Sequence, residues 1–259
     1  MAKLIAHELE SEEERRELDE ALKLANQTNE TRARFMGILG HDLRNPLNTI
    51  LMAATVQQDS NHDQNQNALM TDMILRTTRR MQFLIEDLLD ASQTAQGNQI
   101  LIQKKSGDLG EICKLIIEEF RLTHPNRKIE FLTQETCDGE WDEGRLGQVL
   151  SNLLSNALSY GSLDYPVKVN LIAECDRVVL QVNNQGETML EEVKKNLFTA
   201  FWRGAKKVRA NANSSGLGLG LYIVKQIVTA HNGTISVESN NEDGTTFTVI
   251  FSRLSETQN

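Results

Sequence analysis

Glycine is distributed very unevenly along this 259-residue chain, and that asymmetry constrains the fold more than any other single feature. Residues 1–96 contain two of the sixteen glycines, Gly37 and Gly40, and residues 97–259 contain the other fourteen. Glycine weakens helix interiors and is favoured in turns and at close backbone approaches. We therefore expect a helical first part and a mixed second part with many turns, a division that the length of the chain allows.

The first part carries apolar side chains at spacings of three and four residues, the period of an amphipathic helix. One seam runs from Leu18 to Ala54 and is interrupted by the polar residues Asn29 and Arg32, whereas a second seam runs from Met70 to Leu88. The wholly polar segment 59–67 between them predicts the turn of an antiparallel helical hairpin. Two such helices have more apolar surface than they can bury against each other, so the expected assembly is a homodimeric four-helix bundle.

Strand and helix patterns alternate after residue 98 and predict an α/β sandwich, with a mixed sheet and helices on one face. The expected strands span residues 100–102, 128–132, 167–172, 177–182, 234–238 and 245–251. The expected helices span residues 109–122, where Asp108 is the N-cap, 143–158 and 217–230.

Composition excludes several classes of function. Lys and Arg total 27 against 36 Asp and Glu, and a net charge of −9 argues against a nucleic-acid partner. No run of about 18 apolar residues is present, so we expect no membrane contact from this segment. The N-terminus lacks an apolar signal core, which favours a cytoplasmic location. Three widely spaced cysteines form neither a disulfide framework nor a zinc motif.

A glycine-rich stretch directly precedes the apolar helix expected near the C-terminus. Gly216, Gly218 and Gly220 alternate with Leu217 and Leu219. Glycine lets the backbone approach a ligand closely, and a helix N-terminus offers unpaired N–H groups to phosphate. A flexible lid or tight helix–sheet packing explains the same pattern about equally well. The spacing matches neither the P-loop nor the dinucleotide-binding fingerprint.

Two asparagines, Asn152 and Asn156, are four residues apart on the helix expected over 143–158, so they share one face. Paired amide oxygens suit a hard cation such as Mg²⁺, which keeps several waters and takes further ligands from phosphates. Alone, the pair would be read as a solvated polar stripe. The glycine-rich stretch some 60 residues later favours the binding site.

One histidine, His41, stands in the middle of the first helix with Asp42 beside it and Asn45 one turn later. Pro46 should bend the helix at this point. A neutral imidazole is a good nucleophile for phosphorus at neutral pH, and a carboxylate that holds its other N–H makes it stronger. The four remaining histidines, at positions 7, 62, 124 and 231, have polar flanks and are expected on the surface.

These motifs in this order resemble the catalytic core of a two-component sensor histidine kinase, over about residues 30–252. The resemblance rests on a phosphoacceptor motif beginning at His41, an asparagine motif from Asn152 to Asn156, a phenylalanine motif from Phe198 to Phe201, a lid from Gly216 to Gly220 and a hairpin from Gly244 to Phe247. Several motifs are most similar to the bacteriophytochrome-type branch.

The resemblance implies a dimerisation and histidine-phosphotransfer hairpin followed by a Bergerat-type ATP-binding domain. In this reading ATP and Mg²⁺ are the cofactors, Asn152 and Asn156 contact the metal and phosphates, and His41 attacks the γ-phosphate with Asp42 as general base. Asn45 would orient a water that dephosphorylates the partner. The implied nucleotide-binding residues are Asn152, Asn156, Asn184, Gly186, Gly216, Leu217, Gly218, Leu219, Gly220 and Thr246.

One departure from the family pattern concerns the adenine contact. Where the family has Asp-x-Gly-x-Gly, this chain has Asn184, Gly186 and Thr188. An asparagine oxygen still accepts a hydrogen bond from adenine, but without charge assistance, which costs about 1 kcal/mol. A second departure is Ser159, where a basic residue is usual; Arg203 or Lys206 would be candidates for that charge.

The expected function is ATP-dependent autophosphorylation of His41 and transfer of the phosphoryl group to an aspartate on a response-regulator receiver domain, with a possible phosphatase activity toward that partner. A catalytically weak or phosphatase-dominant module is the first alternative. An ATPase that acts as a conformational clamp is the second, but Asn152 stands where such ATPases carry a catalytic glutamate.

The expected domains are a coiled-coil signalling helix over 1–32, the phosphotransfer hairpin over 33–97, the ATP-binding domain over 98–254 and a tail over 255–259. An upstream sensor domain is expected to be missing from this chain.

Overall fold

The computed structural model describes residues 15, 40, 43–58, 64–95, 97–133, 136–202 and 217–253. The chain divides into two compact units, Met1–Met81 and Gln82–Asn259, and each is described by itself. The expected coiled coil over 1–32 lies outside the described residues, as does the expected tail over 255–259.

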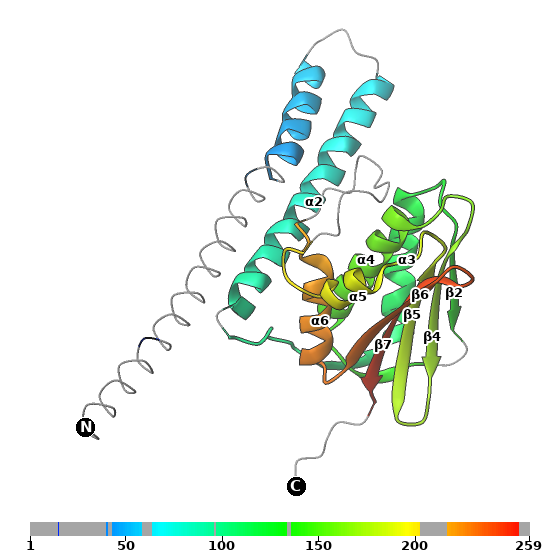
Figure 1. The fold of residues 1–259 in the computed structure, drawn as a ribbon. Helices are drawn as coiled ribbons and strands as arrows, with labels where there is room; N and C mark the ends of the chain where they lie inside the picture. The colour runs from blue at the N-terminus through cyan, green and yellow to red at the C-terminus, as the bar shows by residue number, and fades with distance from the viewer. Residues whose placement is uncertain are drawn as a thin grey trace, which may run out of the picture. The chain divides into compact units, whose positions relative to one another are not determined.

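Two helical segments make up most of the described part of the first unit (Figure 1). Residues 43–58 form one helix, and α2, Gln64–Ala95, begins in this unit and continues into the second. Gln57 Nε2 donates to the carbonyl oxygen of Asn67 at 3.0 Å and to the hydroxyl of Thr71 at 2.7 Å, which joins the two helices. The helical hairpin is confirmed. The expected turn over 59–67 is too long, because the last four of its residues already form the first turn of α2, where no apolar face is needed.

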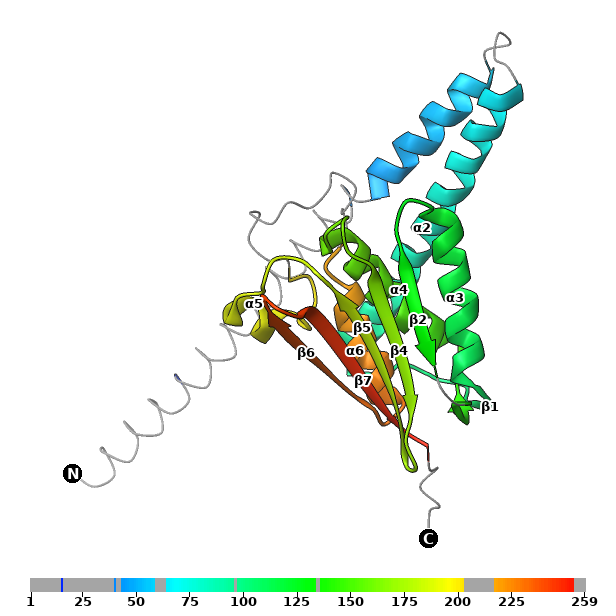
Figure 2. The ribbon, with the colours of Figure 1, turned by 90° about the vertical axis from the view of Figure 1, so that its right-hand side faces the viewer.

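The second unit is organised around a five-stranded sheet with the order β2-β4-β5-β7-β6. Its strands are β2, Ile129–Thr133; β4, Val167–Ala173; β5, Arg177–Asn184; β6, Thr234–Asn240; and β7, Gly244–Ser252. β2 and β4 run parallel, and every other pair is antiparallel, so the sheet is mixed. Figure 2 shows the strands side by side.

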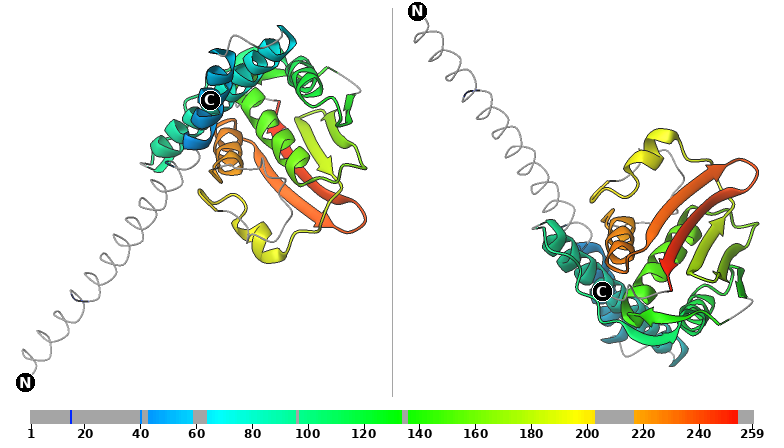
Figure 3. Two further views of the ribbon diagram at one scale, coloured as in Figure 1. Left: turned by 90° about the horizontal axis from the view of Figure 1, so that it is seen from above. Right: turned by 90° about the horizontal axis from the view of Figure 1, so that it is seen from below.

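Three helices of this unit cover one face of the sheet: α3, Leu109–Thr123; α4, Glu143–Tyr160; and α6, Gly220–Ala230. The short α5, Glu191–Asn196, contains no buried residue. Asp108 caps α3 by accepting from Gly110 N, as expected, and Asp142 caps α4 by accepting from Arg145 N. Figure 3 shows α4 in green and α6 in orange, next to each other on the same face.

An apolar core fills the space between the sheet and the helices. Alternate residues of the two central strands point into it, as the two-residue period of a strand requires. The fully or almost fully buried side chains include Val178, Leu180 and Val182 of β5, Phe247, Val249 and Phe251 of β7, Val149, Leu153 and Leu154 of α4, and Ile223, Ile227 and Val228 of α6. The predicted sandwich, with helices on one face of a mixed sheet, is therefore confirmed.

Several short elements differ from expectation. Residues 100–102 form no strand; instead β1, Lys105–Asp108, pairs with β3, Asp138–Trp141, in a small two-stranded sheet. The apolar pattern here reflects burial rather than a strand, because Ile100 is 4% exposed although it lies in an irregular segment. Helix α6 begins at Gly220 rather than at 217, because the leucine–glycine stretch before it is a loop.

The prediction that all four remaining histidines lie on the surface is wrong for His231. His231 is 3% exposed and lies at the end of α6. Its Nδ1 lies 2.9 Å from the carbonyl oxygen of Ile227, and its Nε2 accepts from Asp142 N at 3.2 Å, an arrangement that satisfies a neutral imidazole. Burial lowers the pKa of this imidazole. Within the part of the chain that the structure describes, no helix has the length and apolarity to cross a membrane.

Candidate nucleotide-binding site

The two asparagines predicted to bind metal lie on one face of α4, and both are half-buried. Leu153 and Leu154, which follow Asn152 directly, are fully buried and fix the rotation of the helix about its axis. Packing of the two leucines therefore determines which way the side of α4 that carries the asparagines faces. The N-cap at Asp142 determines where the helix starts.

Asn152 points toward the start of α6. A Cβ atom built on Gly220 would lie 2.8 Å from Asn152 Oδ1, so a side chain at position 220 would collide with this amide oxygen. Leu219, the N-cap residue of α6, makes no side-chain capping hydrogen bond. The asparagine oxygen thus lies beside a helix N-terminus whose own N-cap residue offers the N–H groups no side-chain acceptor, a setting that favours an anion.

The leucine–glycine loop before α6 is anchored by its leucines. Leu217 and Leu219 are 2% and 1% exposed, while Gly218 has a φ of +70°, a left-handed conformation that favours glycine. The carbonyl of Gly218 accepts from Phe201 N at 3.1 Å, which ties this loop to the predicted phenylalanine motif. Gly216, Arg203 and Lys206 lie outside the described residues.

Asn184 ends β5 on the same face of the sheet as the core and is 5% exposed. A Cβ on Gly186 would lie 2.8 Å from the carbonyl oxygen of Tyr160 and 3.4 Å from Asn184 Nδ2. The end of β5 therefore lies against the C-terminal end of α4, and position 186 admits only glycine. Thr188, which stands where the family pattern has its second glycine, donates to Asn241 Oδ1 in the turn between β6 and β7.

The structure places one predicted nucleotide-binding residue, Thr246, on the face of the sheet opposite to Asn184. Asn184 pairs with Thr245, and Asn183 pairs with Thr246, so the two threonines lie on opposite faces of the sheet. Thr246 Oγ1 accepts from Asn183 Nδ2 at 2.9 Å on the far face. Thr245 is 3% exposed, shares the face of Asn184 and contacts the hydroxyl of Ser239 at 2.8 Å. The residue beside Asn184 is therefore Thr245.

A hollow of about 450 Å³ lies next to Gly186, at the rim of the sheet. Its lining comes from Ser162, Tyr165, Gln185, Gly186, Glu187, Asn241 and Glu242 and does not include Asn152 or Asn156. The hollow therefore does not mark the predicted metal and phosphate site, which we place at Asn152 and Asn156 and the start of α6.

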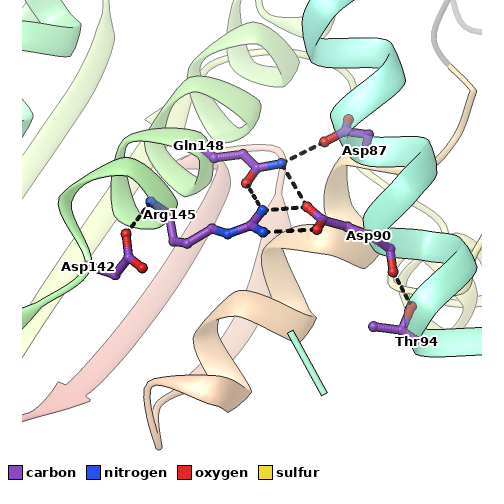
Figure 4. A network of polar contacts seen from close by, with 6 residues as sticks. All are labelled: Asp87, Asp90, Thr94, Asp142, Arg145 and Gln148. Atoms are coloured by element: carbon purple, nitrogen blue, oxygen red, sulfur yellow. Dashed lines mark hydrogen bonds and ion pairs between the residues drawn. The ribbon is translucent and has the colours of Figure 1, made fainter. Parts of the chain in front are cut away.

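A buried polar network joins the last turns of α2 to α4, and both parts belong to the second unit (Figure 4). Asp90 and Arg145 form a two-pronged ion pair, with N–O distances of 2.5 and 3.0 Å. Gln148 accepts from Arg145 at 3.0 Å and donates to Asp87 Oδ1 at 2.9 Å. Asp87 also accepts from the side-chain amide of Asn152. Sequence patterns alone did not indicate this network.

The environment of Asp87 changes its titration. Burial raises the pKa of this carboxyl to about 6, and the neighbouring Asp90 adds to the increase, while hydrogen bonds from Gln148 and Asn152 oppose it. The Asp87 side chain is therefore an unusual carboxylate that lies directly against one of the predicted metal ligands.

The predicted phosphoacceptor residues are only partly described. His41 and Asp42 lie outside the described residues. Asn45 is exposed on the helix over 43–58, and its carbonyl accepts from the Thr49 hydroxyl at 3.0 Å.

The described residues form a helical hairpin followed by a helix-covered mixed sheet, in which Asn152 faces the start of α6. Two family models match the chain in that order. Residues 31–97 match the His Kinase A (phospho-acceptor) domain, and residues 141–255 match the histidine kinase-, DNA gyrase B- and HSP90-like ATPase family.

Individual relatives agree with the two models. The chain is 34% identical over 217 residues to a bacteriophytochrome of Pseudomonas aeruginosa, and the aligned region covers 84% of this chain and 29% of that protein. It is 29% identical over 228 residues to the sensor histidine kinase YvrG of Bacillus subtilis, and the aligned region covers 86% of this chain and 39% of that protein. The chain thus spans less than half the length of either relative.

Solved structures agree on the fold. The catalytic domain of histidine kinase ThkA matches with a TM-score of 0.51 and 26% identity, covering 59% of this chain and 99% of that one. The structure of ThkA in complex with the response regulator protein TrrA matches with a TM-score of 0.57 and 22% identity, covering 85% and 61%. The chain belongs to the sensor histidine kinases of two-component systems and carries their catalytic core.

Proposed function

We propose that this chain binds ATP with Mg²⁺, phosphorylates its own His41 and passes the phosphoryl group to an aspartate of a receiver domain. The observation that carries the proposal is the side-chain oxygen of Asn152 on α4, which faces the start of α6 behind the leucine–glycine loop. That arrangement supplies hard oxygen ligands and backbone N–H groups next to each other, which a magnesium-bound triphosphate needs.

The residues present fit the nucleotide and its metal. Asn152 and Asn156 would hold Mg²⁺, which neutralises phosphate charge when bound. Gly216, Gly218 and Gly220, with Leu217 and Leu219, would cover the phosphates. Asn184 and Gly186, together with Thr245 in place of Thr246, would contact the adenine, since Asn184 and Thr245 lie on the same face of the sheet.

The chemical step uses the phosphoacceptor motif. An imidazole nitrogen of His41 attacks the γ-phosphorus, the new N–P bond forms, and the bond to the ADP oxygen breaks. Asp42 accepts the imidazole proton as general base. The receiver aspartate then takes the phosphoryl group from His41. In the separate phosphatase reaction, Asn45 orients the water that hydrolyses the aspartyl phosphate of the receiver domain, which releases inorganic phosphate and the free aspartate. ThkA forms a complex with a response regulator protein, and that precedent supports a partner of this type.

The hairpin is proposed to act as a homodimer. In the first unit Leu47, Leu51, Leu69 and Met73 remain 38–63% exposed in a single chain. Exposed apolar residues repeated at helical spacing favour a helical partner, and a second copy supplies the same surface. The domain limits at 33–97 and 98–254, a cytoplasmic location and a missing upstream sensor domain are part of the same proposal.

A phosphatase-dominant module remains the second candidate, and Asn184 is the observation that favours it. A neutral amide replaces the charged adenine acceptor of the family pattern, which weakens ATP binding by about 1 kcal/mol. Calorimetric titration with ATP separates the two candidates, because a kinase at cellular ATP needs a submillimolar dissociation constant, whereas affinity far weaker than that favours the phosphatase reading.

The kinase proposal is tested by incubating the protein with γ-labelled ATP and Mg²⁺. We expect wild type to take up label that is acid-labile and alkali-stable, as a phosphohistidine is, and both His41→Gln and Asn156→Ala to take up none. His124→Gln, at an exposed histidine outside the motif, is the matched control and should label as wild type does. Equal labelling of His41→Gln would refute the assigned acceptor.

A further inference from the structure

The side-chain amide of Asn152 lies between two different environments. Its nitrogen donates to the carboxylate of Asp87, which comes from α2. Its oxygen lies on the other side, at the start of α6, 2.8 Å from the place a Cβ on Gly220 would occupy. The two ends of one amide are therefore sorted, with the donor toward α2 and the acceptor toward the proposed phosphate site.

We propose that Asp87 is a positioning residue that fixes the orientation of Asn152, so that the amide oxygen faces the metal and phosphates. The inference rests on the proposed function, because the metal site at Asn152 is part of that proposal. It adds a residue from α2 to a site whose other members all lie between residues 152 and 245.

The need for a fixed orientation follows from the amide group itself. The oxygen and nitrogen of an asparagine are almost equal in size, so the side chain can turn by half a rotation with little steric cost. A turned Asn152 would direct N–H groups at a cation, which repel it. Groups that orient metal ligands in this way commonly change metal affinity by about 10- to 100-fold when they are removed.

A carboxylate is the group that enforces this orientation. An ionised carboxylate only accepts hydrogen bonds, so both amides that face Asp87 must present nitrogen to it. Gln148 does so at 2.9 Å, and its oxygen accepts in turn from Arg145 at 3.0 Å. Asp90 holds Arg145 through the two-pronged ion pair. The chain of contacts in Figure 4 therefore keeps Asp87 in place and leaves its remaining acceptor capacity for Asn152.

The test compares magnesium-dependent with magnesium-free nucleotide binding in the full chain. Asp87→Asn keeps the shape but offers one acceptor and one donor to two amide donors, so Asn152 relieves the conflict by turning. We expect the affinity for ADP by calorimetry to fall about tenfold in excess Mg²⁺ and to stay within about twofold of wild type in EDTA. Glu86→Gln is the matched control, because it removes a neighbouring exposed charge, and we expect it to bind ADP as wild type does in both buffers.

A double-mutant cycle identifies the route. If Asp87 acts through Asn152, then Asp87→Asn has no further effect on magnesium-dependent binding in an Asn152→Ala background. Asp87→Ala gives the same readout should Asp87→Asn fail to melt cooperatively. An equal loss in Mg²⁺ and in EDTA, an additive cycle, or unchanged binding in Asp87→Asn would each overturn the inference. A wild type whose ADP affinity ignores Mg²⁺ would instead overturn the metal site of the proposed function, and this inference with it.

Discussion

The helical hairpin and the ATP-binding sandwich bury their apolar residues in opposite ways. In the sandwich, large side chains such as Leu153, Phe247 and Ile223 are at most 1% exposed. In the hairpin, the seam residues Met70 and Ile74 are only half-buried, and Leu51 and Leu69 are 63% and 60% exposed. A sheet covered by helices completes a core within one chain, whereas two helices cannot. We therefore expect the hairpin, but not the sandwich, to depend on a second copy of the chain to cover its apolar surface.

The largest expected effect comes from charging the exposed face of the hairpin. Leu51→Glu combined with Leu69→Glu should convert a dimer into a monomer, because two like charges at each apolar contact oppose association. Sedimentation velocity measures the mass, and autophosphorylation should fall at least about tenfold.

The matched control makes the same change on the sandwich. Leu115→Glu with Leu122→Glu alters two leucines of α3 that are 73% and 82% exposed, and the mass should not change. A charged hairpin that still sediments as a dimer would break the comparison between the two regions.

The next largest effect lies in the sandwich core. Leu153→Ala removes a fully buried side chain and should lower the free energy of unfolding by about 3 kcal/mol, through lost burial and the cavity that remains. Because this core belongs to one chain, the loss should be the same at every protein concentration. Chemical denaturation at two concentrations checks this, and a concentration-dependent loss would mean that the sandwich also depends on a partner.

A smaller effect is expected at the adenine contact. Asn184→Asp should tighten ATP binding about fivefold, since a charged acceptor makes a stronger hydrogen bond than a neutral one. The same change should lower the melting temperature of the nucleotide-free protein, because it places a carboxylate at a 5% exposed position. Calorimetry and thermal melting measure the two effects, and weaker ATP binding would remove Asn184 from the adenine site.

The smallest expected effect is on pH dependence. Burial lowers the pKa of His231, and nearby Lys104 lowers it further, while the backbone contact of Ile227 and the charge of Asp142 oppose the decrease. The unfolded chain then binds a proton more readily than the folded one, so stability is intact above about pH 6.5 and declines as the pH falls below it. His231→Gln should flatten the melting temperature between pH 7.5 and 5.5 relative to wild type. Parallel curves would contradict the assignment, since all other titrating groups are common to both proteins.

Long periodic elements of this chain were predictable, and short ones were not. The helix at α3 was predicted with its cap at Asp108, and the helix at α4 was predicted with its start at Glu143, because fifteen and eighteen residues give several turns of pattern. β3 and α5 were missed, since four and six residues are too few to display a period.

The site was predictable where spacing alone determines which side chains share a face. Asn152 and Asn156 share a helix face because they are four residues apart. Thr246 lies on the face opposite to Asn184, because a shift of one residue along a strand reverses the face, and the pattern Gly-Thr-Thr-Phe does not determine the register. The contacts of Asp87 and Asp90 with α4 join residues about 60 positions apart, and no local pattern carries that information.

The most direct test of the central claim is to locate the phosphate. Wild-type protein incubated with Mg²⁺ and ATP, digested at neutral or alkaline pH and fragmented by electron transfer in a mass spectrometer, should carry one phosphoryl group on the imidazole of His41. The modification should be absent when ADP replaces ATP. A phosphate found on any other residue, with His41 unmodified, would contradict the account of both regions.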